Sequence, residues 1–320
     1  MAPPPEVRQL VKSTSTLDNW RNWMYLLTDY GIAVGVAYVA QLSHSWTVYL
    51  LSVVVIGSRM RAVANLLHEA AHRKLFRNRH MNNTAGILLL AWPLASGFRQ
   101  YARLHALHHV YLWDKDSDPD AKLYFSTKTD ERSDQRYGYA RFWLVNVVLV
   151  ILPIRPLQLF FLAAKNQPSR TFKLAFASVI VVVAGLRGWG AGLMLTRYWL
   201  APFFTTYLAI TYWAELGEHG GLRSFGRRWG TRNWVGNPIT RWLIGSHSDD
   251  LYHLLHHWFP SVPHYNLRKL DTACCQIWPA YGRQYRCGGF FLGSQEISSV
   301  MHDIWRPDLR RGLSRSPDRG

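Results

Sequence analysis

Long apolar segments dominate the chain, and the longest reach the roughly 20 residues that cross the hydrocarbon core of a bilayer. Two of them, residues 23–42 and 46–67, are joined by a short polar link and therefore predict a helical hairpin. A second pair of spans is predicted at residues 172–186 and 198–213. The pattern thus predicts an all-α integral membrane protein with four transmembrane helices.

Two further apolar stretches are not expected to cross the membrane. Residues 85–95 are too short for a full span and contain Pro93, and residues 142–164 are interrupted by Pro153 and Pro156. Proline lacks the backbone N–H that a helix interior needs. We expect both stretches to be interfacial or re-entrant.

Nine of the 14 histidines fall into four clusters that follow helical spacing. The clusters place imidazoles at i and i+4, or at i, i+3 and i+4, and hence on one side of a helix. The candidate metal ligands are His68, His72, His105, His108, His109, His219, His253, His256 and His257. Imidazole binds iron, zinc, copper and nickel. A zinc site is filled by about three or four protein ligands, whereas nine imidazoles suffice for two metals with open coordination positions.

The four clusters must meet on one side of the membrane, which constrains the topology. The chain must cross an even number of times between consecutive clusters, and four spans satisfy this condition. Arg73, Lys74 and Arg77 follow the first cluster, and positive charge beside a span marks the cytoplasmic side. We therefore expect a multi-pass membrane protein with a cytoplasmic metal site.

The net charge indicates which kinds of partner to expect, and the cysteine content indicates whether to expect disulfides. The formal net charge is +17, which fits attraction to the lipid bilayer or to an acidic protein partner. No nucleic-acid partner is expected, because no nucleic-acid-binding motif accompanies the charge. The three cysteines suggest no disulfide framework. Residues 1–20 are expected to be a flexible lead-in, residues 21–290 one catalytic domain and residues 291–320 a basic tail.

Glu69 supports a second interpretation of the first histidine cluster. The run His68-Glu69-Ala70-Ala71-His72 matches the H-E-x-x-H signature, in which two histidines bind zinc and the glutamate is the general base of a metalloprotease. A membrane-embedded zinc protease would leave the other histidine clusters without a role. With two metals, Glu69 is instead expected to hold a ligand imidazole in one tautomer.

The last cluster carries a resemblance to a known family. His253-Leu254-Leu255-His256-His257-Trp258-Phe259-Pro260, with Pro263-His264-Tyr265-Asn266-Leu267 after it, resembles the third histidine box of acyl-lipid desaturases. Asp118-Pro119-Asp120 soon after the second box is also similar to the family. From about residue 20 to residue 270, the chain resembles the membrane-bound fatty acid desaturase and hydroxylase superfamily.

The resemblance implies four spans, a cytoplasmic helical cap and a di-iron site. Two irons would activate dioxygen, as co-substrate, and abstract hydrogen from an unactivated C–H bond, with the nine histidines as ligands. In some members of the superfamily, a further ligand histidine follows four residues after an asparagine. In this chain His219 occupies the position of that histidine, and Glu215 occupies the position of the asparagine. Glu215 is expected to bind iron or to orient a bound water, and Glu218 is a rival for that catalytic role. Alternatively, either acid is a solvated group at the end of the span.

The same resemblance implies a non-haem di-iron oxidoreductase, most simply a desaturase of a fatty acyl chain or of a specialised metabolite. Electrons would come from a separate ferredoxin or cytochrome b5-like donor. Small bacterial members also act on non-lipid metabolites, including an amino-acid enol ether, so a bacterial inner membrane is expected. A hydroxylase, a carotenoid hydroxylase or ketolase, and a non-catalytic membrane receptor or scaffold are the alternatives.

An acyl substrate would need an apolar tunnel. Five large apolar residues are candidates for its lining, although each also fits an ordinary hydrophobic core. They are Trp92, Phe98, Trp213, Trp242 and Leu255.

Overall fold

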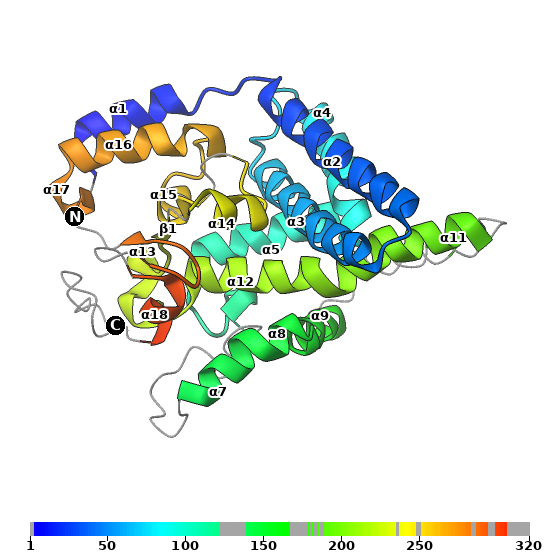
Figure 1. Ribbon diagram of the computed structural model, residues 1–320. Helices are drawn as coiled ribbons and strands as arrows, with labels where there is room; N and C mark the ends of the chain where they lie inside the picture. Colours follow the sequence, from blue (N-terminus) through cyan, green and yellow to red (C-terminus); the bar gives the residue numbers. More distant parts are fainter. Residues whose placement is uncertain are drawn as a thin grey trace.

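The computed structural model describes residues 3–121, 139–166, 189–234, 237–247, 251–282, 286–293 and 298–305, with residues 178, 181 and 185. These ranges are mostly helical, as the sequence predicts, and the helices surround a common centre (Figure 1). Within them, β1 (Asn233–Trp234) pairs in parallel with β2 (Arg286–Cys287).

The first predicted hairpin is present as α2 (Arg21–Ser43) and α3 (Trp46–Ala71), which pack against each other. Ser45 precedes α3 in an extended conformation and its side chain accepts a hydrogen bond from the Val48 N–H, which caps the helix. Both helices are long and apolar enough to cross a membrane. Leu27, Val34 and Leu42 on α2 are exposed, as expected for a face in contact with lipid.

The predicted break at Pro153 is confirmed. The helical path of α7 (Tyr139–Trp143), η3 (Leu144–Val148) and α8 (Leu149–Ile151) ends there, and α9 (Ile154–Asn166) leaves at an angle of 78°. Together the two arms form a broken span or a re-entrant loop. The described residues therefore contain two helices fit to cross a membrane, or three if this bent pair is one span.

The structure describes only part of the second predicted pair of spans. Residues 172–186 lie outside the described residues, apart from three single positions. Residues 198–213 belong to a helical path that ends at the metal-site region. It runs through α11 (Trp189–Leu195), η4 (Thr196–Leu200), η5 (Phe203–Tyr207) and α12 (Leu208–His219). The total of four spans therefore stays a prediction.

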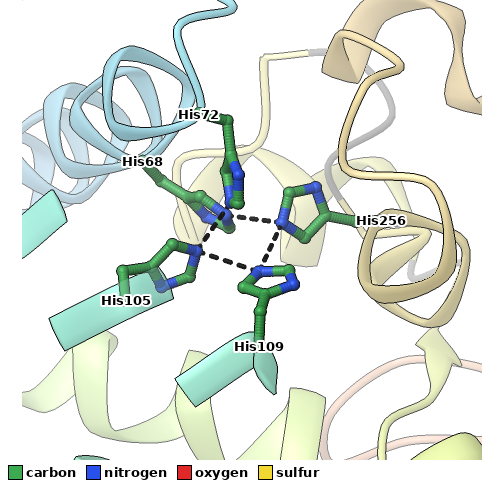
Figure 2. Close-up of side chains that lie close together, drawn as sticks. All are labelled: His68, His72, His105, His109 and His256. Atoms are coloured by element: carbon green, nitrogen blue, oxygen red, sulfur yellow. Dashed lines mark hydrogen bonds between the residues drawn. The ribbon is translucent and has the colours of Figure 1, made fainter. Parts of the chain in front are cut away.

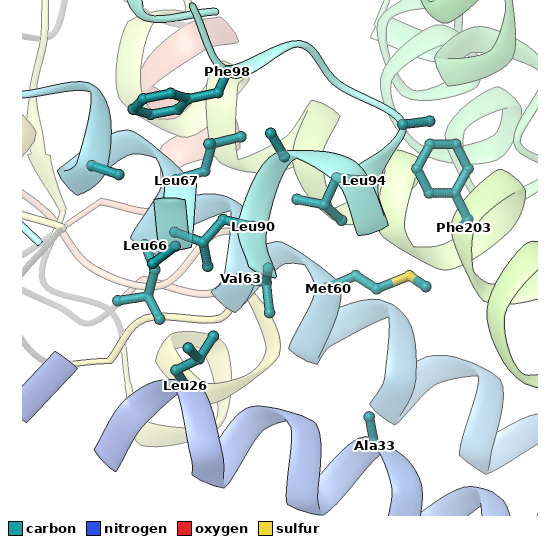
Figure 3. Packing of buried hydrophobic residues seen from close by; sticks show 14 of the residues in the cluster. Leu26, Ala33, Met60, Val63, Leu66, Leu67, Leu90, Leu94, Phe98 and Phe203 are labelled. Atoms are coloured by element: carbon teal, nitrogen blue, oxygen red, sulfur yellow. The ribbon is translucent and has the colours of Figure 1, made fainter. Parts of the chain in front are cut away.

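The apolar stretch around Pro93 forms a bent connection into the second histidine helix. It comprises α4 (Arg79–Ala85), η1 (Gly86–Ala91) and η2 (Trp92–Leu94), and it leads into α5 (Phe98–Tyr111). Leu90, Leu94 and Phe98 pack with Leu66 of α3 in the main hydrophobic cluster (Figure 3). A Cβ atom on Gly86 would lie 2.7 Å from the Phe98 ring, so only glycine permits this close approach.

The remaining elements cover the ends of α3, α5 and α12. They are η6 (Arg223–Phe225), α13 (Gly226–Trp229), α14 (Pro238–Leu243), α15 (His253–Trp258), η7 (His264–Asn266), α16 (Leu267–Ile277), α17 (Pro279–Gly282) and α18 (Val300–Trp305). Buried Arg232 joins α12 to α18, because it donates hydrogen bonds to the Gly217 carbonyl at 2.8 Å and to Asp303 at 2.8 Å. It thereby satisfies a carbonyl group that the end of α12 leaves open.

The N-terminal segment differs from the sequence expectation. Instead of a flexible lead-in, residues 5–14 form α1 (Pro5–Thr14), which packs against α16 (Figure 1). Val7, Leu10 and Val11 recur at helical spacing and join the cluster under α16, with Val7 fully buried. Helical spacing of apolar residues in a short polar segment is the signal that this expectation overlooked. The domain boundaries at residues 20 and 290 stay predictions.

A buried ionic network holds the hairpin to the segment after α14. The Asp29 carboxylate on α2 accepts a hydrogen bond from Arg59 on α3, at 3.0 Å, and pairs with His247 after α14. The Arg59 guanidinium also lies over the Trp242 ring, 4.5 Å from its centroid. Charged groups that interrupt an apolar hairpin are thus neutralised by one another.

Candidate metal centre

The C-terminal ends of α3 and α5 bring the first two histidine clusters face to face. His68 and His72 lie one turn apart at the end of α3, with His72 as its C-cap, and His105 and His109 lie one turn apart on α5 (Figure 2). His256 of α15 completes this group of five. One ring nitrogen from each residue lies within 4.8 Å of the others.

The nitrogens in this five-histidine group point at one another. The Nε2 atoms of His68 and His256 are 2.7 Å apart, and those of His72 and His105 are 2.8 Å apart. His109 Nε2 lies 3.0 Å from His105 Nε2 and 3.1 Å from His256 Nε2. The arrangement has the form of a ring of ligands around one point (Figure 2).

The other four histidines form a second group beside the first. His219, at the end of α12, has its Nε2 atom 3.1 Å from that of His253, which in turn is 3.1 Å from that of His257. His108 shares a candidate metal position with His219 and His257. Glu218 joins His219 and His253, with its Oε2 atom 3.7 Å from His253 Nε2.

Helical geometry explains why each of two helices serves both groups. On α5, His105 and His109 belong to the five-histidine group and His108 to the second. On α15 the division is reversed, because His253 and His257 belong to the second group and His256 to the first. The three positions lie on one broad face, but at 3.6 residues per turn the i+4 residue is rotated by about 40° to one side of residue i and the i+3 residue by about 60° to the other. The His109 and His257 rings stack between the groups at 4.1 Å.

The electrostatics favour neutral imidazoles, the form that binds metal. Burial lowers the pKa of His72 to about 4 and that of His109 to about 2. Burial likewise holds the pKa values of His253, His256 and His257 well below their usual range. A neutral imidazole has one N–H and one lone pair, so five converging nitrogens cannot all be paired with one another by hydrogen bonds. A cation at their centre would bind the lone pair of every nitrogen, and an all-imidazole set fits iron.

His108 has a different environment. Its Nδ1 atom lies 3.0 Å from Asp118, which also accepts the Trp113 backbone N–H, and 3.3 Å from Asp120. Burial opposes a charge on His108, but Asp120 and Asp118 outweigh it and raise the pKa to about 9. With metal on Nε2, the Nδ1–H would donate to Asp118, which fixes the tautomer and orients the ring.

Replacement of Asp118 by alanine is expected to weaken metal binding about 10- to 100-fold, because the partner of a ligand histidine is lost. Competition with a chelator, read as metal content against chelator concentration, measures the change. The matched control is Asp116→Ala at an exposed position of the same loop, which should leave the curve unmoved. Equal curves for both variants would contradict the role of Asp118.

The three acids considered from the sequence occupy different places. Glu218 is buried between the second histidine group and Arg61, with 3.5 Å between the carboxylate and the guanidinium. Glu215 is half-buried and lines a cavity beside the metal centre. Glu69 accepts the backbone N–H of His264 at 3.2 Å, while its neighbours His68 and His72 lie in the five-histidine group rather than in an isolated zinc site.

The cavity has a volume of about 330 Å³ and reaches ligands of both groups. Tyr207, Thr211, Glu215 and His219 line it from successive turns of one helical path. Other polar and aromatic groups come from α3 and α5, namely Arg61, Gln100 and Tyr101. The Tyr101 ring stacks on the ligand His105 at 5.7 Å. Apolar residues such as Leu67, Phe160 and Phe203 complete the lining, so the cavity combines polar groups with apolar walls.

None of the five candidate tunnel residues lines this cavity. Leu255 and Phe98 are core residues, and Trp213 packs with a second core cluster. Trp92 and Trp242 are partly exposed. The sequence interpretation named Glu215 but overlooked Arg61 and Tyr101, although these cavity residues carry the same signal. Arg61 lies two helical turns before His68, Tyr101 one turn before His105, and Glu215 one turn before His219.

Comparison with known proteins agrees with this geometry. Residues 44–289 match the family model described as fatty acid desaturase. The chain belongs to the fatty acid desaturase family. It is therefore an oxidoreductase enzyme, a desaturase whose histidine groups fit a di-iron site. The metalloprotease and non-catalytic alternatives are set aside.

Several desaturases are similar over most of the chain. Dihydrorhizobitoxine desaturase of Bradyrhizobium elkanii is 30% identical over 313 residues, covering 93% of this chain and 88% of that protein. A chloroplastic sn-2 acyl-lipid omega-3 desaturase (ferredoxin) of Helianthus annuus is 22% identical, covering 89% and 69%. An omega-3 fatty acid desaturase of Glycine max is 25% identical, covering 89% and 67%.

Proposed function

We propose that this desaturase holds two iron ions in its two histidine groups and uses dioxygen to convert a CH2–CH2 unit into CH=CH. The balanced reaction consumes one O2, two electrons and two protons, and releases two waters. When bound, iron would supply the activation of dioxygen and the removal of hydrogen. The observation that supports this most is the convergence of nine imidazoles in two adjacent groups beside one cavity.

The chain's own residues would position the reactants. Asp118 orients the His108 ring, and Tyr101 stacks on His105. Glu218 pairs with Arg61 and lies beside His219 and His253, where it would adjust the charge of the second metal group. Glu215 faces the cavity, where it would bind the substrate or orient a water next to the metal.

The charged groups in the cavity lining, Arg61 and Glu215, favour one substrate class. A hydrocarbon chain against Arg61 and Glu215 would remove water from both charged groups without offering hydrogen bonds, which is costly. A small metabolite with a carboxylate and an ammonium group would pair with both. We therefore favour a small zwitterionic metabolite over an acyl lipid. The similarity to dihydrorhizobitoxine desaturase, over nearly the full length of both chains, supports this choice.

The proposed setting is the bacterial inner membrane, with four spans and a cytoplasmic helical cap that holds the metals. The candidate spans α2 and α3 and the basic residues beside the first histidine cluster support it. The electron donor is proposed to be a ferredoxin. The name of the Helianthus annuus relative includes this donor, and a separate acidic carrier suits a chain of net charge +17.

The test combines elemental analysis of detergent-purified protein with dioxygen uptake under reducing conditions. We expect about two irons per chain and uptake that depends on a fraction of small zwitterionic metabolites. Uptake with membrane acyl lipids alone would overturn the substrate class and leave the reaction intact. One zinc per chain with no uptake would overturn the reaction itself.

Glu215→Gln is expected to raise KM for the substrate about tenfold while iron stays near two per chain, because an amide keeps the shape but loses the charge that pairs with an ammonium group. Steady-state kinetics and iron content measure the two effects separately. Asp116→Asn, at an exposed position, is the control. A loss of one iron per chain with unchanged KM would assign Glu215 to the metal instead.

A further inference from the structure

The metal centre has two accessible sides, which present different imidazoles. The substrate cavity is lined by His68, His105, His108, His219 and His253. A separate pocket of about 440 Å³ is lined by His109 and His257. The two sets share no histidine. One side of the metal pair thus faces the substrate cavity, and another faces this second pocket.

The second pocket joins both metal groups. His109 belongs to the five-histidine group and His257 to the other, and their rings stack at 4.1 Å with an interplanar angle of 13°. An electron that arrives at this stacked pair is therefore next to both metals. In the substrate cavity the two groups also meet, through His105 and His108, but these rings lie farther apart, at 6.0 Å and 29°.

The rim of the pocket is basic and aromatic. Arg227 and Arg228 of α13 are exposed, and Trp258 and Trp278 lie beside them. Trp258 donates its indole N–H to the Arg228 carbonyl at 2.7 Å, and the Arg228 guanidinium lies 5.6 Å from the Trp258 ring centroid. Within the described residues, neither arginine has an acidic side chain at ion-pair distance. The two cations are thus available to an acidic partner.

We propose that this pocket and its rim, formed by Arg227, Arg228 and Trp258 with the buried Trp278 behind them, are the docking surface for the ferredoxin that reduces the metal centre. The inference rests on the proposed function. Acidic side chains of the ferredoxin would pair with the two arginines, and its apolar surface would cover the partly exposed Trp258. Each reduced [2Fe–2S] ferredoxin gives one electron and leaves oxidised, so two successive dockings supply the two electrons of one turnover.

Substrate and donor therefore approach from different sides. The donor does not enter the substrate cavity, and the substrate does not block the donor. Docking does not require the substrate to leave, so both electrons can arrive while the substrate is bound. This arrangement fits a reaction in which dioxygen activation must await both reduction and substrate.

The test reverses the charge of the rim in the full-length protein, as Arg227→Glu with Arg228→Glu. With a reduced plant-type [2Fe–2S] ferredoxin as donor at low salt, we expect the KM for ferredoxin to rise about tenfold or more, because attraction becomes repulsion. The wild-type KM should rise with added salt, whereas that of the variant should not. Arg79→Glu, exposed on α4 and far from α13 in Figure 1, is the matched control and should behave as wild type.

A small reductant separates docking from the reaction. Dithionite-reduced methyl viologen needs no docking surface, so it should drive the double variant at the wild-type rate within about twofold. Equal loss with both reductants would show a structural defect and overturn the docking role. An unchanged KM for ferredoxin would overturn it as well, as would stronger inhibition by Arg79→Glu. Absence of oxidation in wild-type protein with either reductant would instead refute the proposed function.

Discussion

His256→Ala is expected to reduce bound iron from about two to about one per chain and to lower the rate of substrate oxidation at least about 1,000-fold. His256 Nε2 lies 2.7 Å from that of His68 and 3.1 Å from that of His109, so it closes the ring of the five-histidine group. Alanine leaves a gap that no neighbouring side chain fills with a lone pair. A reaction that needs both metals then stops, because the contributions of residues that act as a unit are not additive.

Iron content by elemental analysis and dioxygen uptake with substrate measure the two effects of His256→Ala. The matched control is His80→Ala, since His80 is exposed and lies outside both histidine groups. A companion variant, His257→Ala, removes a ligand of the second group and should give the same result. Full iron content and full activity in either ligand variant would contradict the proposed di-iron centre.

Asp29→Ala is expected to lower the free energy of unfolding by about 3–5 kcal/mol, the range for removing one partner of a buried ion pair. Asp29 is 2% exposed and pairs with Arg59 and His247. Without it, the buried Arg59 guanidinium keeps its charge and loses its carboxylate. The interface of α2, α3 and the segment after α14 should therefore loosen, although no metal ligand is touched.

The thermal unfolding midpoint in detergent measures this loss. Asp18→Ala is the control, because the Asp18–Arg21 pair is partly exposed and such pairs contribute only about 0–1 kcal/mol. Asp29→Asn keeps a hydrogen-bond acceptor for Arg59, so its unfolding midpoint should lie between those of Asp29→Ala and Asp18→Ala. Equal midpoints for Asp29→Ala and wild type would show that the network does not stabilise the fold.

Features that depend on local interactions could be predicted from the sequence, whereas features that depend on packing between distant segments could not. The α2–α3 hairpin and the break at Pro153 were predictable because apolar length and the missing N–H of proline act locally. Helix α1 was not expected, because its stability depends on packing against α16, more than 250 residues away in the chain. The tunnel candidates were chosen by residue type, and the tertiary packing placed them elsewhere.

The sequence by itself determined which imidazoles are available, since spacings of three and four residues place side chains on one face of any helix. It also determined the family, through the same clusters. Only the tertiary structure decided the division into groups of five and four, because this depends on how α3, α5, α12 and α15 cross. The crossing also decided that Arg61, Tyr101 and Glu215 share one cavity and that His109 and His257 face another. Contacts between helices that are distant in the sequence are determined by packing, and the local spacing of residues does not predict them.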